Sequence, residues 1–455
     1  MGWVPLIVQL SLRRIRSSRA LLALIAAVTF STITLVAIAA IYSQTLGEAG
    51  LRHALASVGP NSLQMRVVVN DRPMGEADYL RLRDAVEKPI EARLGWLKDY
   101  QHRHGHSQSV PMGITEDGTG QMEMLQDKAF VFFQTGLQDK VDLVEGRWPS
   151  SRSDTANPET VALEVLVGAS VARREGWVAG TEIVLFPYGT SSDARALMRI
   201  VGVMEPRDAG ELYWLGDTSY FDLMAEGSVQ LAPIFLREED FFGKLGAAYP
   251  TVMVNYWWFT FLDVGKLNIS RVGKTRHDLQ VLETDINKAL PRSLVLTGLG
   301  PTLGDFQQKL VLSRVPLLLF VALVVGVLLY FLVLAMNLLV RSRSREMALL
   351  RGRGASAWQA AVLLVLGEGV LITAVSVAAA PLVAWGIVRA FLAGSLSPAG
   401  VADPASLVTL TRAVWLLSVC VGIAVLLILL LVSLYSSRAH LADFLKERAR
   451  PPGVP

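Results

Sequence analysis

"ALLALIAAVTFSTITLVAIAAIY", residues Ala20–Tyr42, is an uncharged apolar stretch near the start of a chain of 455 residues. A transmembrane helix needs about 20 consecutive, mostly apolar residues, so this stretch is long enough to cross a bilayer. A cleaved signal peptide is the other interpretation, because "AIAA" resembles a cleavage site. The apolar core of a signal peptide covers only about 7–15 residues, however. The stretch therefore predicts a first membrane span at residues 20–42.

Three further apolar stretches predict three further spans, at residues 315–340, 357–388 and 413–435. The third is the least uniform, because Glu368 stands between two glycines and Pro381 follows, which predicts a kinked helix. The chain has 52% hydrophobic residues, a mean hydropathy of +0.41 and a net charge of +3. This composition is typical of membrane spans joined to a water-soluble domain, and the small net charge does not favour a nucleic-acid partner.

The loop at 389–412 is poor in basic residues, whereas three basic clusters lie beside the predicted spans and, with four spans, all fall on the other side of the membrane. They are Arg13, Arg14, Arg16 and Arg19, then Arg341, Arg343, Arg345, Arg351 and Arg353, then Arg438, Lys446, Arg448 and Arg450. Because cytoplasmic loops are enriched in Lys and Arg, both termini, the loop at 341–356 and the tail at 436–455 are predicted to be cytoplasmic. Residues 43–314 then form an extracytoplasmic domain, and residues 389–412 form a short loop that is also extracytoplasmic. The only cysteine, Cys420, permits no intrachain disulfide, which favours a bacterial inner membrane.

Residues 1–19 predict an amphipathic helix in the cytoplasmic membrane interface. In "WVPLIVQLSLRRIRSSR", Trp3, Leu6, Ile7 and Leu10 share one helical face, and the arginines gather at the far end. A simple extension of the first span is the alternative.

The extracytoplasmic segment mixes helical and strand patterns. Apolar residues recur at helical spacing in Glu76–Leu97 and His277–Leu290. Four stretches rich in β-branched and aromatic residues predict strands: Gln64–Asn70, Lys128–Gln134, Thr181–Pro187 and Met198–Met204. The fold class predicted is an α-helical membrane protein with four transmembrane helices and a large mixed α/β domain inserted between the first and second.

Two local features are candidate sites with a structural alternative. "HRHGH" places His102, His104 and His106 on one side of an extended segment, where zinc or copper could bind. A polar surface loop is favoured instead, because no cysteine and no obvious carboxylate stands nearby, and no metal is predicted. Glu368 is an ionisable residue inside a span and so a functional candidate, with a bond to a neighbouring helix as its structural alternative. The aromatic run Val254–Phe261 either binds an apolar substrate or packs in the core, and core packing is favoured.

Three stretches of the extracytoplasmic segment follow one another in a recognisable order: "VEGRWP" (Val144–Pro149), "ETVALEVLVGASVARREGWVAGTEIVLF" (Glu159–Phe186) and "MRIVGVMEP" (Met198–Pro206). Together they resemble the MacB-like periplasmic core domain of FtsX-like and MacB-like ABC transporter permeases. The loop after the second span, "SREMALLRGRGASAWQ" (Ser344–Gln359), resembles the family's coupling loop, with an Arg-Glu pair, a short helix and a Gly-Ala turn. The resemblance covers the four-span layout, the core domain and this loop.

The resemblance implies that this loop couples the chain to an ATPase. The residues assigned to coupling are Arg345, Glu346, Met347, Leu349, Leu350, Arg351, Gly352, Gly354 and Ala355. Met347 and Leu350 lie one helical turn apart and can insert into a groove on a partner. A plain positive-inside anchor is the alternative for the arginines.

The sequence contains no G-x-x-x-x-G-K-[ST] phosphate loop, and no catalytic constellation stands out, so the chain itself is not predicted to be an enzyme. ATP and Mg²⁺ would be bound by a separate ATPase. The resemblance implies a dimer of permeases, identical or related, that transmits ATP-driven motion to the outside domain for export or extraction of a lipoprotein, a peptide or an amphiphile. The alternatives are an FtsX-type regulator of a cell-wall hydrolase, which would need an extracytoplasmic protein partner, and a membrane-anchored ligand-binding sensor without an ATPase.

Overall fold

The computed structural model describes residues 19–115, 122–150, 160–186, 195–227, 229–342, 358–359, 362, 369–394 and 407–448. Contacts between residues divide the chain into two compact units. We call Met1–His53 with Gln308–Pro455 the helical unit, and Ala54–Gln307 the α/β unit.

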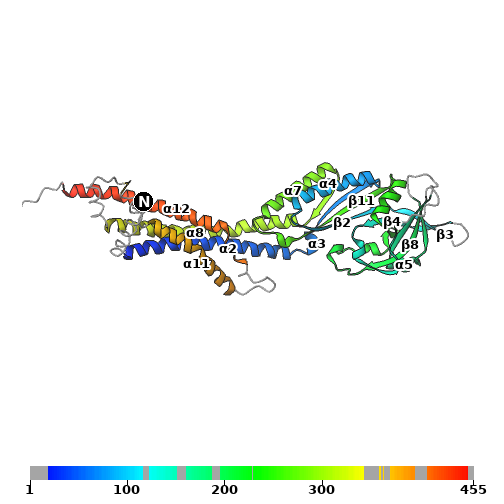
Figure 1. Cartoon of the computed structure of the whole chain (residues 1–455), viewed down its shortest axis with the longest axis horizontal. Helices are drawn as coiled ribbons and strands as arrows, with labels where there is room; N and C mark the ends of the chain where they lie inside the picture. Colours follow the sequence, from blue (N-terminus) through cyan, green and yellow to red (C-terminus); the bar gives the residue numbers. More distant parts are fainter. Residues whose placement is uncertain are drawn as a thin grey trace, which may run out of the picture. The chain divides into compact units, whose positions relative to one another are not determined.

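Four described helices are long and apolar enough to span a membrane (Figure 1). They are α2 (Arg19–Ala56), α8 (Leu299–Ser342), α11 (Val370–Gly394) and α12 (Arg412–Arg448). This confirms the prediction of a four-span membrane protein with an α/β domain between the first and second spans. Two helices extend well beyond the predicted spans, however: α2 continues past Tyr42 to Ala56, and α8 begins at Leu299 instead of residue 315.

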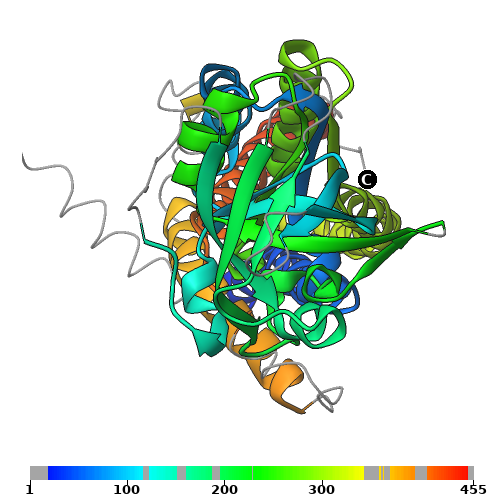
Figure 2. The ribbon, with the colours of Figure 1, turned by 90° about the vertical axis from the view of Figure 1, so that its right-hand side faces the viewer.

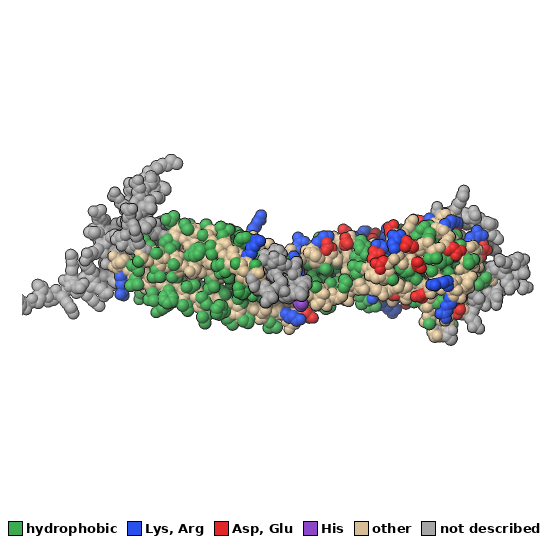
Figure 3. All heavy atoms as spheres, turned by 90° about the horizontal axis from the view of Figure 1, so that it is seen from below, with side chains coloured by type: hydrophobic (Ala, Val, Ile, Leu, Met, Phe, Trp, Pro, Cys, Tyr) green, Lys and Arg blue, Asp and Glu red, His purple; other side chains and the backbone are tan. Residues whose placement is uncertain are grey.

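Two apolar clusters hold the helical unit together. At one level, α2 packs against α8 and α12 through Leu22, Ile25, Val28, Leu332, Met336, Val340, Val425 and Leu429. At another, α2 packs against α11 and the start of α12 through Ala37, Ile41, Ala384, Val388, Val408 and Val414. A Cβ at Gly422 of α12 would lie 2.7 Å from Val377 Cγ2 of α11, so this glycine allows the close approach of the two helices. Many apolar side chains of these helices are exposed, and they gather on the face of the unit seen in Figure 3, as lipid contact requires.

The α/β unit is built on one twelve-stranded mixed sheet (Figures 1 and 2). The strand order is β12-β1-β11-β2-β4-β3-β7-β8-β6-β10-β9, with β5 paired to β8 and a further pairing of β4 with β10. The strands are β1 (Met65–Pro73), β2 (Lys98–Ser107), β3 (Val110–Thr115), β4 (Met122–Gln134), β5 (Val141–Gly146), β6 (Thr160–Gly168), β7 (Glu182–Leu185), β8 (Arg195–Pro206), β9 (Met224–Glu226), β10 (Val229–Leu236), β11 (Met253–Leu262) and β12 (Leu294–Thr297). The four predicted strands correspond to β1, β4, β7 and β8.

Helices cover one face of the strands β1, β11 and β2. The helices there are α4 (Glu76–Leu94) and α7 (Val272–Ala289), which pack against each other. Three short helices lie elsewhere in the chain order: α3 (Pro60–Leu63) precedes β1, α5 (Ala169–Glu175) packs against β6 and β8, and α6 (Glu238–Asp240) follows β10. Tyr79 of α4 lies on this face, with its ring 5.3 Å from that of Tyr256 and 5.9 Å from that of Phe133. The opposite face carries the side chains that alternate with these, including Trp257 and Phe259 of β11, and is covered in part by two 3₁₀ turns, η2 (Leu212–Trp214) and η3 (Ser219–Phe221).

The chain enters and leaves the α/β unit through paired strands. β1, which follows α3, is antiparallel to β12, which precedes α8, and Met65 pairs with Thr297. Next to this pair the Gly298 N–H donates to the Ser62 carbonyl at 2.8 Å. A Cβ at Gly298 would lie 2.7 Å from that oxygen, so a side chain there would push the two connections apart.

Candidate functional site

The predicted coupling residues, Arg345 to Ala355, lie outside the described residues, as does Glu368. Residues 1–18 of the predicted interfacial helix also lie outside them. The assignments made for these positions stay predictions. The described part of α8 ends at Ser342, whose hydroxyl donates to the Leu339 carbonyl at 2.8 Å.

The first turns of α8 are fixed firmly to the α/β unit. Leu299 and Leu303 are fully buried, and Phe306 is buried as well. Arg276 of α7 donates from Nη1 to Gln307 Oε1 at 3.0 Å. We call Gly298–Gln307 the root of α8. From the root, α8 continues as one helix to Ser342, and Pro316 does not interrupt it.

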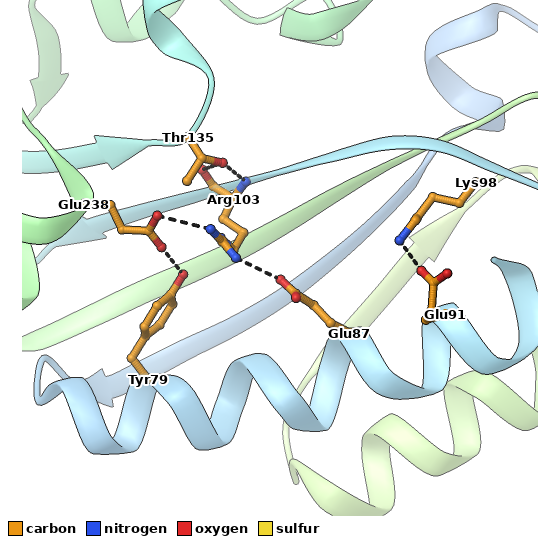
Figure 4. A network of polar contacts seen from close by, with 7 residues as sticks. All are labelled: Tyr79, Glu87, Glu91, Lys98, Arg103, Thr135 and Glu238. Carbon is orange, nitrogen blue, oxygen red and sulfur yellow. Dashed lines mark hydrogen bonds and ion pairs between the residues drawn. The ribbon is translucent and has the colours of Figure 1, made fainter.

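A polar network fastens α4 to the sheet (Figure 4). Arg103 of β2 donates to Glu87 Oε1 at 3.3 Å and to Glu238 Oε2 at 3.1 Å. The Tyr79 hydroxyl donates to the other oxygen of Glu238 at 2.7 Å, and the Arg103 N–H donates to the Thr135 hydroxyl oxygen at 2.8 Å. Burial and the neighbouring Glu238 raise the pKa of Tyr79, so it stays a neutral donor. The network joins α4, β2, α6 and the end of β4, and it is structural in character, because each charged group has its partner.

The motif "VEGRWP" forms a turn that is joined to β6 by hydrogen bonds to Glu164. Arg147 donates from Nη1 to Glu164 Oε2 at 2.9 Å, and the Ser150 N–H donates to the same oxygen at 2.6 Å. The hydrogen bond from Arg147 is the main reason why the pKa of Glu164 falls to about 2. Gly146, just before the arginine, has a left-handed φ of 79°. These residues maintain the turn, and their contacts indicate no ligand.

The three histidines are not in a surface loop, so that interpretation is wrong. His102, His104 and His106 lie in β2, between β11 and β4, and the first two are only 4% and 1% exposed. The segment is polar in composition, but its alternation places the imidazoles against aromatic rings of neighbouring strands. Among the described residues, no group of three His, Cys, Asp or Glu side chains is arranged to hold a metal ion.

Burial keeps these imidazoles neutral. It lowers the pKa of His102 to about 3, with the nearby charge of Lys140 adding to the effect. Burial also moves the pKa of His104 well below its ordinary value, with His106 adding to it, and lowers the pKa of His106. His102 Nδ1 and His104 Nε2 have no hydrogen-bond partner among the described residues. Trp257 Nε1, in the ring stacked on His104, also lacks a partner among the described residues, so three buried polar atoms of one layer are unsatisfied, which is rare in folded proteins.

Comparison with known proteins identifies no family for this chain. No protein-family model matches this chain, and no curated protein matches it. Among solved structures, the periplasmic region of MacB from Actinobacillus actinomycetemcomitans matches with a TM-score of 0.27 and 9% identity, over 56% of this chain and 94% of that chain. This degree of similarity is too low to assign a fold or a function. What the helices establish is a multi-pass membrane protein that carries an α/β domain between its first and second spans.

Proposed function

We propose that this protein is the permease subunit of an ABC transporter of the FtsX/MacB type in a bacterial inner membrane. A separate ATPase would bind the cytoplasmic loop at residues 341–356, and the α/β unit would lie outside the cytoplasm. The observation that carries the proposal is the single helix α8, which begins at the fixed root beside β12 and includes the second span up to Ser342. The basic loop that resembles the family's coupling loop follows immediately.

The proposed mechanism is mechanical transmission. A helix rises about 1.5 Å per residue, so α8 is a rod of roughly 65 Å between Leu299 and Ser342. ATP-driven movement of the ATPase would displace the loop end of this rod. At the other end, the buried root residues and the bond between Arg276 and Gln307 would pass the displacement to β12 and its partner β1. The cargo class would be a lipoprotein, a peptide or an amphiphile, handled by a permease dimer.

Co-purification of the detergent-solubilised protein from its native cells tests this proposal. The wild type is expected to bring down an ATPase, identified by mass spectrometry and by ATP hydrolysis. A Glu346→Arg, Leu350→Asp double variant is expected to lose it, because both changes fall in the predicted coupling residues. Arg438→Glu is the matched control, since it reverses a basic residue of another predicted cytoplasmic cluster and leaves the sequence of the loop unchanged.

A third variant separates binding from transmission. Gly298→Val disturbs the root far from the loop, so the ATPase should still co-purify while its stimulation by the permease falls. If no ATPase accompanies the wild type, or if it stays bound to the folded double variant, the permease assignment is refuted and a sensor without an ATPase becomes the better explanation.

A further inference from the structure

We propose that residues Leu212–Phe221 form a lid that opens in acid, released when His102 and His104 beneath it take up protons. The lid comprises η2, η3 and the turn between them. This inference concerns the α/β unit alone and does not depend on the proposed transport function.

The lid is held by ring packing and by the Tyr213 hydroxyl, which donates to the Thr135 carbonyl at 2.9 Å, rather than by sheet pairing. Its backbone hydrogen bonds within the described structure are local, such as Leu215 N–H to Leu212 carbonyl at 3.0 Å and Phe221 N–H to Thr218 carbonyl at 3.1 Å. Leu215 and Gly216 between the two turns have left-handed φ values of 51° and 79°. Such a segment can move as a small unit, because opening it breaks no strand ladder.

Both histidines contact the lid directly. The His102 ring stacks on Tyr213 with centroids 4.3 Å apart, and its Nε2 lies 3.2 Å from the Tyr213 carbonyl oxygen. The His104 ring lies 4.9 Å from the ring of Tyr220. His106 is beside His104, with ring centroids 6.0 Å apart. The two histidines therefore occupy the interface between the lid and the sheet.

The other surroundings of the histidines are mostly aromatic. The rings on His102 from β11 are those of Phe259 and Phe261. The groups around His104 from β4 and β11 are Phe132, Gln134 and Trp257. Of these, only the Gln134 amide favours a protonated imidazole, and an amide is a weak substitute for a carboxylate.

The charged groups near this layer are already engaged. Lys140 lies 5.6 Å from the Tyr213 ring, where its charge opposes protonation of His102, and it pairs with Glu211. Asp217 accepts hydrogen bonds from the backbone and hydroxyl of Ser219 and interacts with Tyr220. The Arg66 guanidinium of β1 lies 5.7 Å from the centre of the Trp257 ring. β11 separates β1 from β2, which carries His104. A proton on either histidine thus creates a cation without a carboxylate partner in a dry layer.

The lid, and not the strand, is the part that yields. β2 is hydrogen-bonded to β11 along its length and to β4 near its end, so displacing the histidines would break the centre of the sheet. Lifting the lid instead lets water reach both rings. Lifting the lid also exposes more of the Trp257 side chain to water. Trp257 lies on the same face of the sheet as Leu294 of the edge strand β12, and Leu294 is already 53% exposed.

The sign and size follow from linkage. The closed form holds both histidines neutral, so it is favoured above their ordinary pKa of 6.5 and loses this advantage as the pH falls below it. If the open form restores an ordinary pKa, going from pH 7 to pH 5 raises the ratio of open to closed lid about 25-fold for each histidine, and about 600-fold for both.

Hydrogen exchange of the full-length protein in detergent, measured by mass spectrometry between pH 7.5 and 5.0, tests the lid. After correction for the intrinsic exchange rate, peptides covering Leu212–Phe221 should lose protection by more than 100-fold, while peptides of α7 keep theirs. His102→Gln and His104→Gln should each reduce the pH dependence, and together abolish it. His277→Gln, at an exposed position of α7, is the control and should leave the response unchanged.

Each other outcome overturns the proposal. A wild-type lid that stays protected at pH 5.0 refutes it without recourse to any variant. Equal loss of protection in the lid and in α7 means global acid unfolding. A pH response that persists in the folded double variant assigns the proton uptake to other groups.

Discussion

Replacing Gly105 with alanine tests the packing of the α/β core at a point where the chain leaves no room for a side chain. A Cβ at this position in β2 would lie 2.2 Å from Cε1 of Phe133, and 3.0 Å from both Cδ1 and Cζ. Phe133 is fully buried, and its ring lies 4.9 Å from Phe241 and 5.1 Å from Phe242. The ring therefore has no free space into which to retreat, and Gly105→Ala must shift either the ring or the strand.

Two opposing effects set the magnitude. Alanine restricts the unfolded chain more than glycine does, which stabilises the folded state by about 0.4–1 kcal/mol where the backbone allows it. Forcing an extra methyl into a packed core costs about 1–3 kcal/mol, and a 2.2 Å approach lies at the severe end. The net expectation is a destabilisation of about 2 kcal/mol. For a domain of this size that lowers Tm by roughly 4–8 °C.

Thermal unfolding of the full-length protein in detergent, followed by tryptophan fluorescence, measures this shift. Gly243→Ala is the matched control, because a Cβ there meets nothing within 4 Å. In the Gly105→Ala background, Phe133→Leu should recover part of the lost Tm by removing the clashing ring edge. A Tm for Gly105→Ala equal to that of the Gly243→Ala control would show that the core accommodates the methyl group, and the packing argument would fail.

Three other experiments probe separate contacts. A double-mutant cycle of Arg103→Ala and Glu238→Gln, followed by Tm, should give a coupling of about 0.5–3 kcal/mol, because each side chain is about a quarter exposed and the pair is only partly screened. Arg147 favours the ionised carboxylate of Glu164 in the folded state, so the wild type loses stability as the pH falls from 4.5 towards about 2. Glu164→Gln should lack this acid-sensitive part of the stability. A pH–Tm profile of the two proteins that stays parallel over that range would contradict this origin. Gly422→Leu should lower the Tm of the helical unit, since a Cβ alone would already lie 2.7 Å from a valine methyl of α11.

Length and composition were sufficient to predict the membrane spans, because a bilayer imposes a minimum length on any uncharged helix. The same reasoning placed the helix ends too close to the membrane. Residues 43–56 and 299–314 are less apolar, so hydropathy assigns them to the outside domain. Their one proline, Pro301, falls in the first turn of α8, where a proline does not stop a helix. Pro316 falls early in the apolar part of α8 and did not mark a boundary.

Strand β2 shows why part of the core was missed. Its residues are mostly polar or histidine, so composition favours a loop, and the partners that bury it, in β11 and the lid, are more than 100 positions away in the sequence. The available signal was the alternation of His102, His104 and His106 together with the aromatic run Val254–Phe261. That run lies in β11 and is largely buried, as the core-packing interpretation predicts. Only pairing the two segments reveals that the imidazoles face aromatic rings.

The two proposals act on strands of the same sheet. The root of α8 leads directly from β12, which pairs with β1, which pairs with β11, which pairs in turn with β2. A displacement of α8 would therefore enter this sheet at its edge strand, β12, and protonation would enter it three strands further in, at β2. If opening the lid changes the free energy of moving β1 and β12, then moving α8 must change the proton affinity of the histidines by the same amount, because coupling between two binding or conformational equilibria is reciprocal. Protonation of the histidines would favour the displacement of α8 if the displaced state holds the lid open. It would oppose the displacement if that state holds the lid closed.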